Sequence, residues 1–388
     1  MNKNTRNNIT GLYLIKFAKW FNLVMPVMVV FYQRNGLDMQ SIFWLKSVYS
    51  SAIVIMEVPS GYMADIWGRK KTLLLGGILG AAGFGLYSFS YGFWAFAVAE
   101  VVLGVGQSFI SGADTAMLYD TLKAAGKEKE YIKQEGWITS TGNFSEAIAG
   151  ICGGVLAALS LRMPFYFQFA VASAAIPGAL LLKEPKNQLI ERTKSFRSTL
   201  LTVKESFSHA KLRAALLLAS FTGTASLTFA WFVQPYFQEA GLPLSLFGIM
   251  WTLLNLTVGV SAIFSFKIKR RLGGKNTLML IVAGLSLGYF LSAWEISFAG
   301  ISVLVGFYIV RGIAHPILKD YINQYTKSEV RATILSLRDL LIRVNFAIIG
   351  PLLGYFTDHY SLKTALIIAG ISYLVTATAA AIPLLNKS

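Results

Sequence analysis

The sequence predicts an all-α polytopic membrane protein, and its composition, run lengths and loop charges all support that fold class. Of the 388 residues, 55% are hydrophobic and 14% are charged, whereas charged residues make up about 25% of a soluble domain. Runs such as Leu73–Ser90, Phe93–Leu118 and Ala214–Val233 carry almost no charge over roughly the 20 residues that cross a bilayer. A soluble enzyme is therefore excluded, and the net charge of +16 does not indicate nucleic acid as a partner.

Twelve apolar runs of about 17–25 residues each predict a transmembrane helix. They lie near residues 11–33, 41–62, 72–90, 93–118, 136–159, 163–182, 214–237, 245–266, 277–294, 298–319, 333–356 and 362–385. Met1–Thr10 is polar and no small-residue cleavage site follows the first run, so we expect that run to be retained as a helix. The single cysteine, Cys152, excludes an internal disulfide.

The basic segment 183–213 divides the chain into two parts of similar length. It holds eight basic residues against three acidic ones, which is typical of a cytoplasmic linker, with an amphipathic helix expected around Ser198–His209. We therefore expect six-helix bundles over residues 1–182 and 214–388.

Charge sorting predicts the orientation in the membrane. One set of loops, together with both termini, carries 26 of the 35 basic residues, while the alternate loops carry only Arg34, Arg162 and Lys363. Basic loops stay on the cytoplasmic side, so both termini are expected inside the cell. Random scatter of charge over the loops would not give this asymmetry.

The two halves also repeat in sequence, at offsets of 200 and 205 residues. The offset of 200 relates Met117–Asp120 to Ile317–Asp320, and Ala147, Gly150 and Gly154 to Ala347, Gly350 and Gly354; the offset of 205 relates Trp67–Thr72 to Leu272–Thr277. Two six-helix halves related by a parallel repeat are one recurring plan of secondary transporters.

The loop after the second helix carries a family signature. Gly61–Lys71 reads G-Y-M-A-D-I-W-G-R-K-K and resembles the G-x-x-x-D-R-x-G-R-K/R-K signature of the major facilitator superfamily. Ile66 departs from it, where an Arg is usual. The resemblance implies the major facilitator fold: two six-helix, pseudo-symmetric bundles around a central cavity, without a cofactor.

The resemblance also implies a cytoplasmic gate. Asp65 would cap the start of helix 11 near Arg331 and Arg338, and Arg69 would pair with Asp120. In the second half, Arg270 or Arg271 would pair with Asp320. The expected gate residues are Gly61, which would permit close helix packing, Asp65, Gly68, Arg69, Asp120, Arg271, Asp320 and Arg338.

Two further signatures of the family are degraded. The helix 4 motif R-x-x-Q-G-x-G reads Glu100-Val-Val-Leu-Gly-Val-Gly106, so an acid replaces the Arg. The helix 5 antiporter motif keeps small residues, which permit close helix packing, but lacks its Pro. Antiport is therefore not assigned from it.

Ionisable and amide side chains within the expected spans are the candidate transport site, because each charge is unfavourable there unless it is paired or hydrated. The resemblance implies that Lys19, Glu100 and Arg311 face a common water-filled space. Expected substrate-binding residues are Lys19, Asn22, Lys46, Gln107, Arg311, Arg343 and Asn345. The alternative is that such charges form buried ion pairs, for example Lys46 with Glu100 or Glu146.

Glu100 and Glu146 are the candidate proton carriers, because a carboxylic acid in apolar surroundings can change its charge near neutral pH. His315 could relay a proton or could be a satisfied helix-end histidine. Deep cations from both halves and deep acids together predict a proton-coupled secondary transporter for an anionic or zwitterionic organic solute.

The alternative function is multidrug efflux by proton antiport, and a receptor or scaffold with a transporter fold is a third class. The sequence contains no G-x-x-x-x-G-K-[ST] nucleotide loop and no His/Cys metal cluster, so we expect neither an enzyme nor ATP-driven transport. The expected partners are a small-molecule substrate, protons and the lipid bilayer of a bacterial inner membrane, with the protein a monomer.

Overall fold

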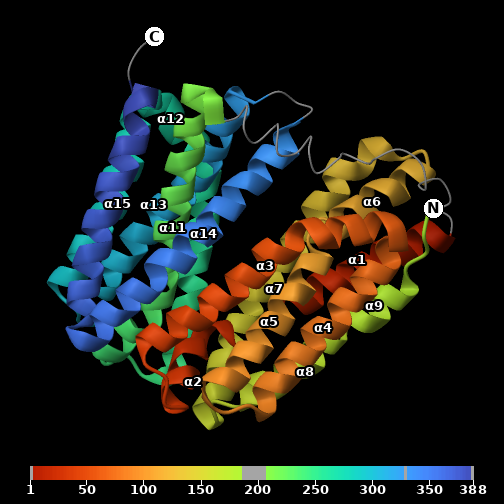
Figure 1. Ribbon diagram of the computed structural model, residues 1–388, viewed down its shortest axis with the longest axis horizontal. Helices are drawn as coiled ribbons and strands as arrows, with labels where there is room; N and C mark the ends of the chain where they lie inside the picture. The colour runs from red at the N-terminus through yellow and green to blue at the C-terminus, as the bar shows by residue number, and fades with distance from the viewer. Residues whose placement is uncertain (1–2, 186–206, 327–329, 386–388) are drawn as a thin grey trace. The chain divides into compact units, whose positions relative to one another are not determined.

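The computed structural model describes residues 3–185, 207–326 and 330–385 (Figure 1). By internal contacts the chain forms two compact units: unit 1 is Met1–Leu37, Val48–Arg192 and Leu244–Thr252, and unit 2 is Asp38–Ser47, Thr193–Pro243 and Leu253–Ser388. Most of the basic linker, including residues 198–206 of its expected amphipathic helix, lies outside the described residues.

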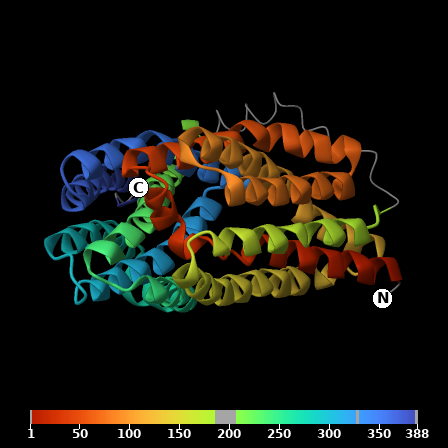
Figure 2. The same cartoon turned by 90° about the horizontal axis from the view of Figure 1, so that it is seen from below.

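Unit 1 is built from helices that pack against one another in pairs. Its elements are α1 (Lys3–Trp20), η1 (Met25–Val27), α2 (Met28–Arg34), most of α3 (Met39–Trp67), α4 (Arg69–Phe89), α5 (Gly92–Ile110), α6 (Ala113–Ala124), η2 (Glu128–Glu130), α7 (Tyr131–Leu159), α8 (Met163–Ser173), α9 (Ala175–Leu181) and the start of α12 (Leu244–Trp294). The α4 and α5 helices pack side by side, as do α1 and α9 (Figure 2).

Unit 2 is organised around α11 (Ala210–Glu239), which packs against three other helices of the unit. Those helices are α13 (Ile301–Gln324), α14 (Arg331–His359) and α15 (Leu362–Leu385). The unit also contains the first residues of α3 and most of α12, so these two long helices are each divided between the units.

Eleven helical stretches of the described residues are long and apolar enough to cross a membrane. One of them, α12, is two helices in series, because Gly273 interrupts it with non-helical backbone angles. Counted as two spans, α12 brings the number to the twelve that the sequence predicts. The first span begins earlier than expected, at Lys3, because Thr5 and Asn8 are buried and extend the helix into the polar segment.

The repeat at an offset of 205 residues is visible in the backbone. Gly68 has φ 88° and ψ 155°, and Gly273 has φ 77° and ψ 163°, a left-handed region that glycine tolerates best. After each glycine a threonine side chain bonds back to it: Thr72 Oγ1 donates to the Gly68 carbonyl at 2.9 Å and Thr277 Oγ1 to the Gly273 carbonyl at 2.7 Å. The two loops therefore share one conformation.

The repeat at an offset of 200 residues marks two close helix contacts. Within unit 1, a Cβ at Gly154 would meet the backbone of Gly248 on α12, and Thr252 Oγ1 donates to the Ala147 carbonyl at 3.0 Å. Small residues thus allow α7 and α12 to approach closely.

Unit 2 has the corresponding contact between α3 and α14. A Cβ at Gly354 would meet the backbone of Gln40, and Ser47 Oγ donates to the Ala347 carbonyl at 3.2 Å. The small residues of both copies therefore serve helix packing, and each contact adds one hydroxyl donor from the facing helix.

The α7 helix carries an exposed apolar stripe. Phe144, Ile148, Ile151, Val155 and Leu159 recur at helical spacing and are all exposed. Such a stripe would be unfavourable in water, whereas the hydrocarbon of a bilayer accommodates it. This face of unit 1 therefore suits contact with lipid.

Candidate functional site

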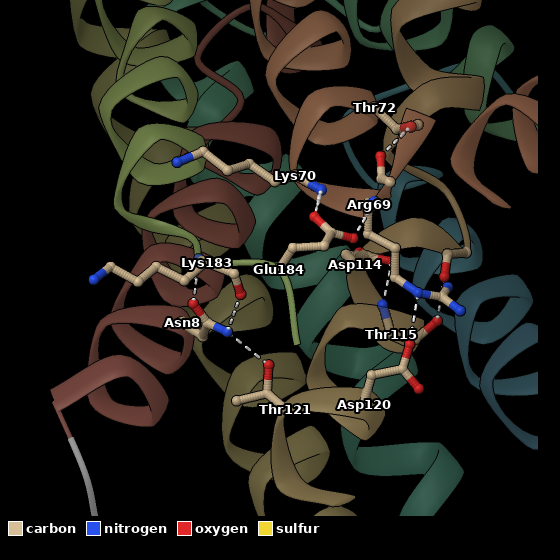
Figure 3. A network of polar contacts seen from close by, with 12 residues as sticks. Asn8, Arg69, Lys70, Thr72, Asp114, Thr115, Asp120, Thr121, Lys183 and Glu184 are labelled. Atoms are coloured by element: carbon tan, nitrogen blue, oxygen red, sulfur yellow. Dashed lines mark hydrogen bonds and ion pairs between the residues drawn. The ribbon is translucent and has the colours of Figure 1, made fainter. Parts of the chain in front are cut away.

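Arg69 and Asp120 form an ion pair between α4 and α6. Arg69 Nε lies 2.6 Å from Asp120 Oδ2, and the carboxylate side chain is only 8% exposed. Arg69 is the first residue of α4, immediately after the positive-φ glycine Gly68. The structure thus contains the pairing that the family resemblance implies (Figure 3); its role in gating remains a proposal.

The sequence analysis missed Glu184, whose carboxylate caps the same helix. Glu184 Oε1 accepts a hydrogen bond from the Arg69 amide at 2.7 Å, and Oε2 accepts one from the Lys70 amide at 3.0 Å. An anion at a helix N-terminus satisfies unpaired amides and complements the helix dipole. A Cβ at Gly68 would lie 3.0 Å from this carboxylate, so glycine also leaves room for the cap. No local sequence pattern connects Glu184 to α4.

Asn8 fixes the segment that carries Glu184. Its Nδ2 donates to Thr121 Oγ1 and to the Lys183 carbonyl, both at 2.9 Å, and its Oδ1 accepts from the Lys183 amide at 2.7 Å. Asn8, Arg69, Asp120, Thr121 and Glu184 therefore join α1, α4, α6 and the start of the linker. We call these five residues the Arg69 network (Figure 3).

In unit 2 the expected pairing of Asp320 with Arg270 or Arg271 is wrong. Lys269 Nζ lies 2.6 Å from Asp320 Oδ2, while Arg270 and Arg271 are exposed. Lys269 continues the buried face of α12 set by Ser261 and Ser265 at four-residue spacing. That periodicity is the signal that could have found it.

The repeated loop around Gly273 has no basic residue at the position that corresponds to Arg69. Gly274 occupies the position that corresponds to Arg69 at the offset of 205 residues, and a Cβ there would meet the Tyr321 hydroxyl at 2.6 Å. Because a side chain does not fit, the cation for Asp320 comes from the preceding helix.

Three other expected gate residues behave differently from one another. Gly61 does not support close packing, because a Cβ there would meet no other atom within 4 Å. Asp65 is exposed, and its expected partner helix belongs to the other unit. Arg338 donates from Nε and Nη2 to Asp339 Oδ1, at 3.0 and 2.7 Å.

Glu100 is not exposed to an open space, contrary to expectation. The residue is 2% exposed, and its Oε1 accepts hydrogen bonds from the hydroxyls of Tyr32 and Tyr87, both at 2.7 Å. Both tyrosines are fully buried. The helical period alone does not reveal this burial, because the tyrosines come from α2 and α4.

The remaining polar candidates of the amino-terminal half occupy varied environments. Lys19, Gln107 and Glu146 are half-buried. Asn22 uses its side-chain oxygen locally, accepting from the Val24 amide at 3.3 Å. Lys46 belongs to unit 2, is buried, and places its ammonium 4.7 Å from the ring centroid of Trp231.

The α13 helix has a basic face. Arg311, His315 and Lys319 follow one another at four-residue spacing, and residues four apart lie on one face of a helix. The charges of Arg338, Lys319, Asp339 and Arg311 all act on His315, so α14 adds its own cation to this face. The Arg311 guanidinium also lies 5.0 Å from the ring centroid of Tyr308.

Two further residues that were expected to bind substrate, Arg343 and Asn345, belong to α14. Arg343 is half-buried. Asn345 donates from Nδ2 to Ser220 Oγ at 2.7 Å, which ties α14 to α11. Its amide therefore has a structural partner already.

Comparisons with known proteins agree with this architecture. The profile described as "Major Facilitator Superfamily" matches residues 12–344. An uncharacterized MFS-type transporter, YxaM of Bacillus subtilis, is 21% identical over 369 residues, covering 90% of this chain and 89% of the relative. The quinolone resistance protein NorA of Staphylococcus aureus is 25% identical over 203 residues, about half of each chain.

Solved structures show the same fold. The nucleoside transporter NupG superposes with a TM-score of 0.83 at 17% identity over all of both chains. A D-xylose-proton symporter superposes with a TM-score of 0.72 at 14% identity, over 97% of this chain and 96% of the other.

The fold and the family match define a multi-pass membrane transporter. The chain belongs to the Major Facilitator Superfamily. Within the described residues no group of three or more His, Cys, Asp or Glu side chains could hold a metal ion.

Proposed function

We propose that the protein is a monomeric, proton-coupled secondary transporter that moves a small anionic or zwitterionic organic solute across a bacterial inner membrane by alternating access. The basic face of α13 carries this proposal. Arg311, His315 and Lys319 share that face, and the charge of Arg338 on α14 acts on the same histidine.

Ionisable side chains in a membrane helix are unfavourable unless they are paired or hydrated. Asp339 is the acid that acts on His315, and Arg338 already binds its carboxylate with two hydrogen bonds. The basic face therefore has a net positive charge that an anionic group can balance. Lys19 and Arg343 are proposed as further contacts to the solute.

Alternating access by the two bundles, 1–182 and 214–388, would involve the ion pairs described above as gate elements, each of which lies within one unit. The Arg69–Asp120 and Lys269–Asp320 pairs are partly exposed, and such pairs each contribute on the order of 1 kcal/mol. That energy biases an equilibrium between two states and can be overcome in each cycle. With both termini cytoplasmic, these pairs would gate the cytoplasmic side.

Multidrug efflux is the second candidate function. NorA of S. aureus and the multidrug resistance protein 2 of B. subtilis, 25% and 26% identical over about half of this chain, favour it. A lipophilic cation would be repelled by the basic face of α13. The two proposals therefore predict opposite substrate charges.

Transport by the reconstituted full chain tests the proposal. Liposomes with an imposed pH gradient would be supplied with labelled mono- and dicarboxylates, amino acids and a cationic dye. We expect gradient-dependent movement of an anionic or zwitterionic solute that Arg311→Gln reduces at least tenfold. Lys363→Gln, on the exposed start of α15, removes one charge elsewhere and is the control. Movement of the dye alone would favour efflux.

A further inference from the structure

The lysine that follows Arg69 is bound to the end of another helix. Lys70 Nζ donates to the Leu180 carbonyl at 2.9 Å, and Leu180 lies in the last turn of α9. The last carbonyls of a helix have no partner within that helix, and a basic side chain complements this end of the helix dipole. The ammonium of Lys70 is therefore held where the start of α4 meets the end of α9.

A second ammonium lies just beyond the same end of α9. The side chain of Lys183 is exposed, but its backbone is fixed, because Asn8 bonds both its amide and its carbonyl. In Figure 3 the side chains of Lys70 and Lys183 extend to the same side, away from Asp120. We call Lys70, Leu180, Leu181 and Lys183 the α4–α9 junction.

Positive charge is in excess on the segments that meet at the α4–α9 junction. Residues 3–8, 65–71 and 180–185 carry six basic residues and two acids, which are Lys3, Arg6, Arg69, Lys70, Lys71 and Lys183 against Asp65 and Glu184. Asp120 of α6 balances Arg69, which leaves an excess of three positive charges. Both carboxylate oxygens of Glu184 already accept from backbone amides. The junction therefore suits a ligand that carries a negative charge.

Apolar side chains are exposed along the helices that lead to the α4–α9 junction. Leu180 and Leu181 are 56% and 40% exposed, and Phe169 on α8 is 43% exposed. The Phe169 ring lies beside α4, since a Cβ at Gly85 would be 3.4 Å from it. The α4 helix packs against both α8 and α9 (Figure 1), so these exposed apolar groups flank one helix.

The length of this apolar surface matches one leaflet of a bilayer. From Phe169 to Leu181 the chain rises about 18 Å at about 1.5 Å per residue. Half of the bilayer hydrocarbon is about 15 Å thick. An acyl chain that lies along Phe169 and Leu181 would thus bring its headgroup to the level of the two ammonium groups.

We propose that the α4–α9 junction binds an anionic phospholipid, with the headgroup phosphate between Lys70 and Lys183 and an acyl chain along Leu181 and Phe169. An ammonium has three donors, and the bond to the Leu180 carbonyl uses one of those of Lys70. Basic clusters at the cytoplasmic ends of membrane helices attract anionic headgroups. The proposed orientation, with both termini cytoplasmic, puts this junction at the inner leaflet.

The bound lipid would also brace the Arg69 network. Glu184 bonds the amide of Lys70, and Asn8 bonds the backbone of Lys183, so a phosphate that bridges the two lysines connects both ends of that network. The site requires neither substrate nor proton. Its failure and the failure of the proposed transport function are therefore separate results.

Native mass spectrometry of the purified full chain tests the site. Dioleoyl-phosphatidylglycerol and dioleoyl-phosphatidylcholine have the same acyl chains but differ in headgroup charge, and each would be titrated into the protein in detergent. We expect the first phosphatidylglycerol to bind more tightly than phosphatidylcholine. Lys70→Gln and Lys183→Gln should each weaken its binding about fivefold, and the double variant should weaken it further.

The matched control removes the same charge elsewhere in unit 1. Lys123 and Lys129 are exposed and lie on another loop that is expected to be cytoplasmic. The double variant Lys123→Gln/Lys129→Gln should bind phosphatidylglycerol as the wild type does. The double variant Lys70→Arg/Lys183→Arg keeps both charges and should retain binding.

Hydrogen exchange distinguishes a lipid from a free anion. Phosphatidylglycerol should slow exchange in peptides that contain residues 69–71 and 180–184, because it holds the start of α4 and the end of α9 together. Inorganic phosphate at the same concentration should not, because it has no acyl chain to contact Phe169 and Leu181.

Three results would overturn the site. The first is an equal loss of phosphatidylglycerol binding in the Lys70→Gln/Lys183→Gln and Lys123→Gln/Lys129→Gln variants, which would indicate general attraction by net charge. The second is equally tight binding of phosphatidylcholine, and the third is equal protection by inorganic phosphate. Should Lys70→Gln fail to fold, Lys183→Gln decides the outcome alone, because that side chain is exposed.

Discussion

The carboxylate of Asp358 binds the backbone of Met39, the first residue of α3. Asp358 Oδ1 accepts from the Met39 amide at 2.9 Å, and Oδ2 accepts from the Gln40 amide at 2.7 Å. Asp358 lies at the end of α14, so one carboxylate fastens the first turn of α3 to that helix. The position that corresponds to it in the other half, at the offset of 200 residues, is Ala158, and the fastening is therefore not repeated there.

Removing this charge should loosen the first turn of α3. An anionic cap on a helix contributes about 1 kcal/mol, which corresponds to about fivefold faster opening. We expect Asp358→Asn to speed hydrogen exchange at Met39 and Gln40 by that factor, measured by mass spectrometry of the peptide that contains them. Glu239→Gln is the control on an exposed site, and unchanged exchange in Asp358→Asn would show that the carboxylate is dispensable.

Glu184 should protect the first turn of α4 in the same way. Its carboxylate bonds the amides of Arg69 and Lys70, so Glu184→Ala is expected to raise their exchange rates about fivefold. Glu184→Gln, which keeps one acceptor oxygen and loses the charge, should lie between the wild type and the alanine variant. Equal exchange in all three proteins would contradict the assignment of Glu184 as a cap.

The Arg69–Asp120 pair should contribute to stability more than a surface pair does. Asp120→Ala removes a largely buried carboxylate that pairs with the half-buried guanidinium of Arg69, and we expect a loss of about 1–2 kcal/mol, seen as a melting temperature lower by a few degrees. The matched control is Glu130→Gln, which breaks the Lys127–Glu130 pair on exposed side chains and should change the melting temperature little. Equal effects of the two variants would rule out a special role for Asp120.

Two glycines of α7 should respond in opposite directions to alanine. A Cβ at Gly154 would meet the backbone of Gly248, whereas a Cβ at Gly136 would meet nothing within 4 Å. Gly154→Ala should therefore lower the melting temperature by several degrees, since backbone cannot move aside easily. Gly136→Ala should leave stability unchanged or raise it by up to about 1 kcal/mol, the helix propensity difference. Thermal unfolding of both variants in the same detergent checks the contrast.

Much of the architecture follows from the sequence because it depends on local patterns. Apolar runs of membrane length predict the spans, and the repeat predicts that Gly68 and Gly273 are equivalent, which their backbone angles confirm. The Arg69–Asp120 pair followed from the family resemblance and is present. The roles of the substrate and proton candidates stay predictions.

Other features depend on how helices are rotated against one another, and only the tertiary structure decided these. Lys269 rather than Arg271 meets Asp320, because α12 turns that face inward. Gly61 remains open, and the carboxylates of Glu184 and Glu100 find their partners on helices distant in the chain. Run length and charge along the sequence fix which segments cross a membrane. Which side chains meet depends on how each helix is rotated and how closely the helices pack. Rotation and packing bring together residues that are far apart in the sequence, and no local pattern connects such residues.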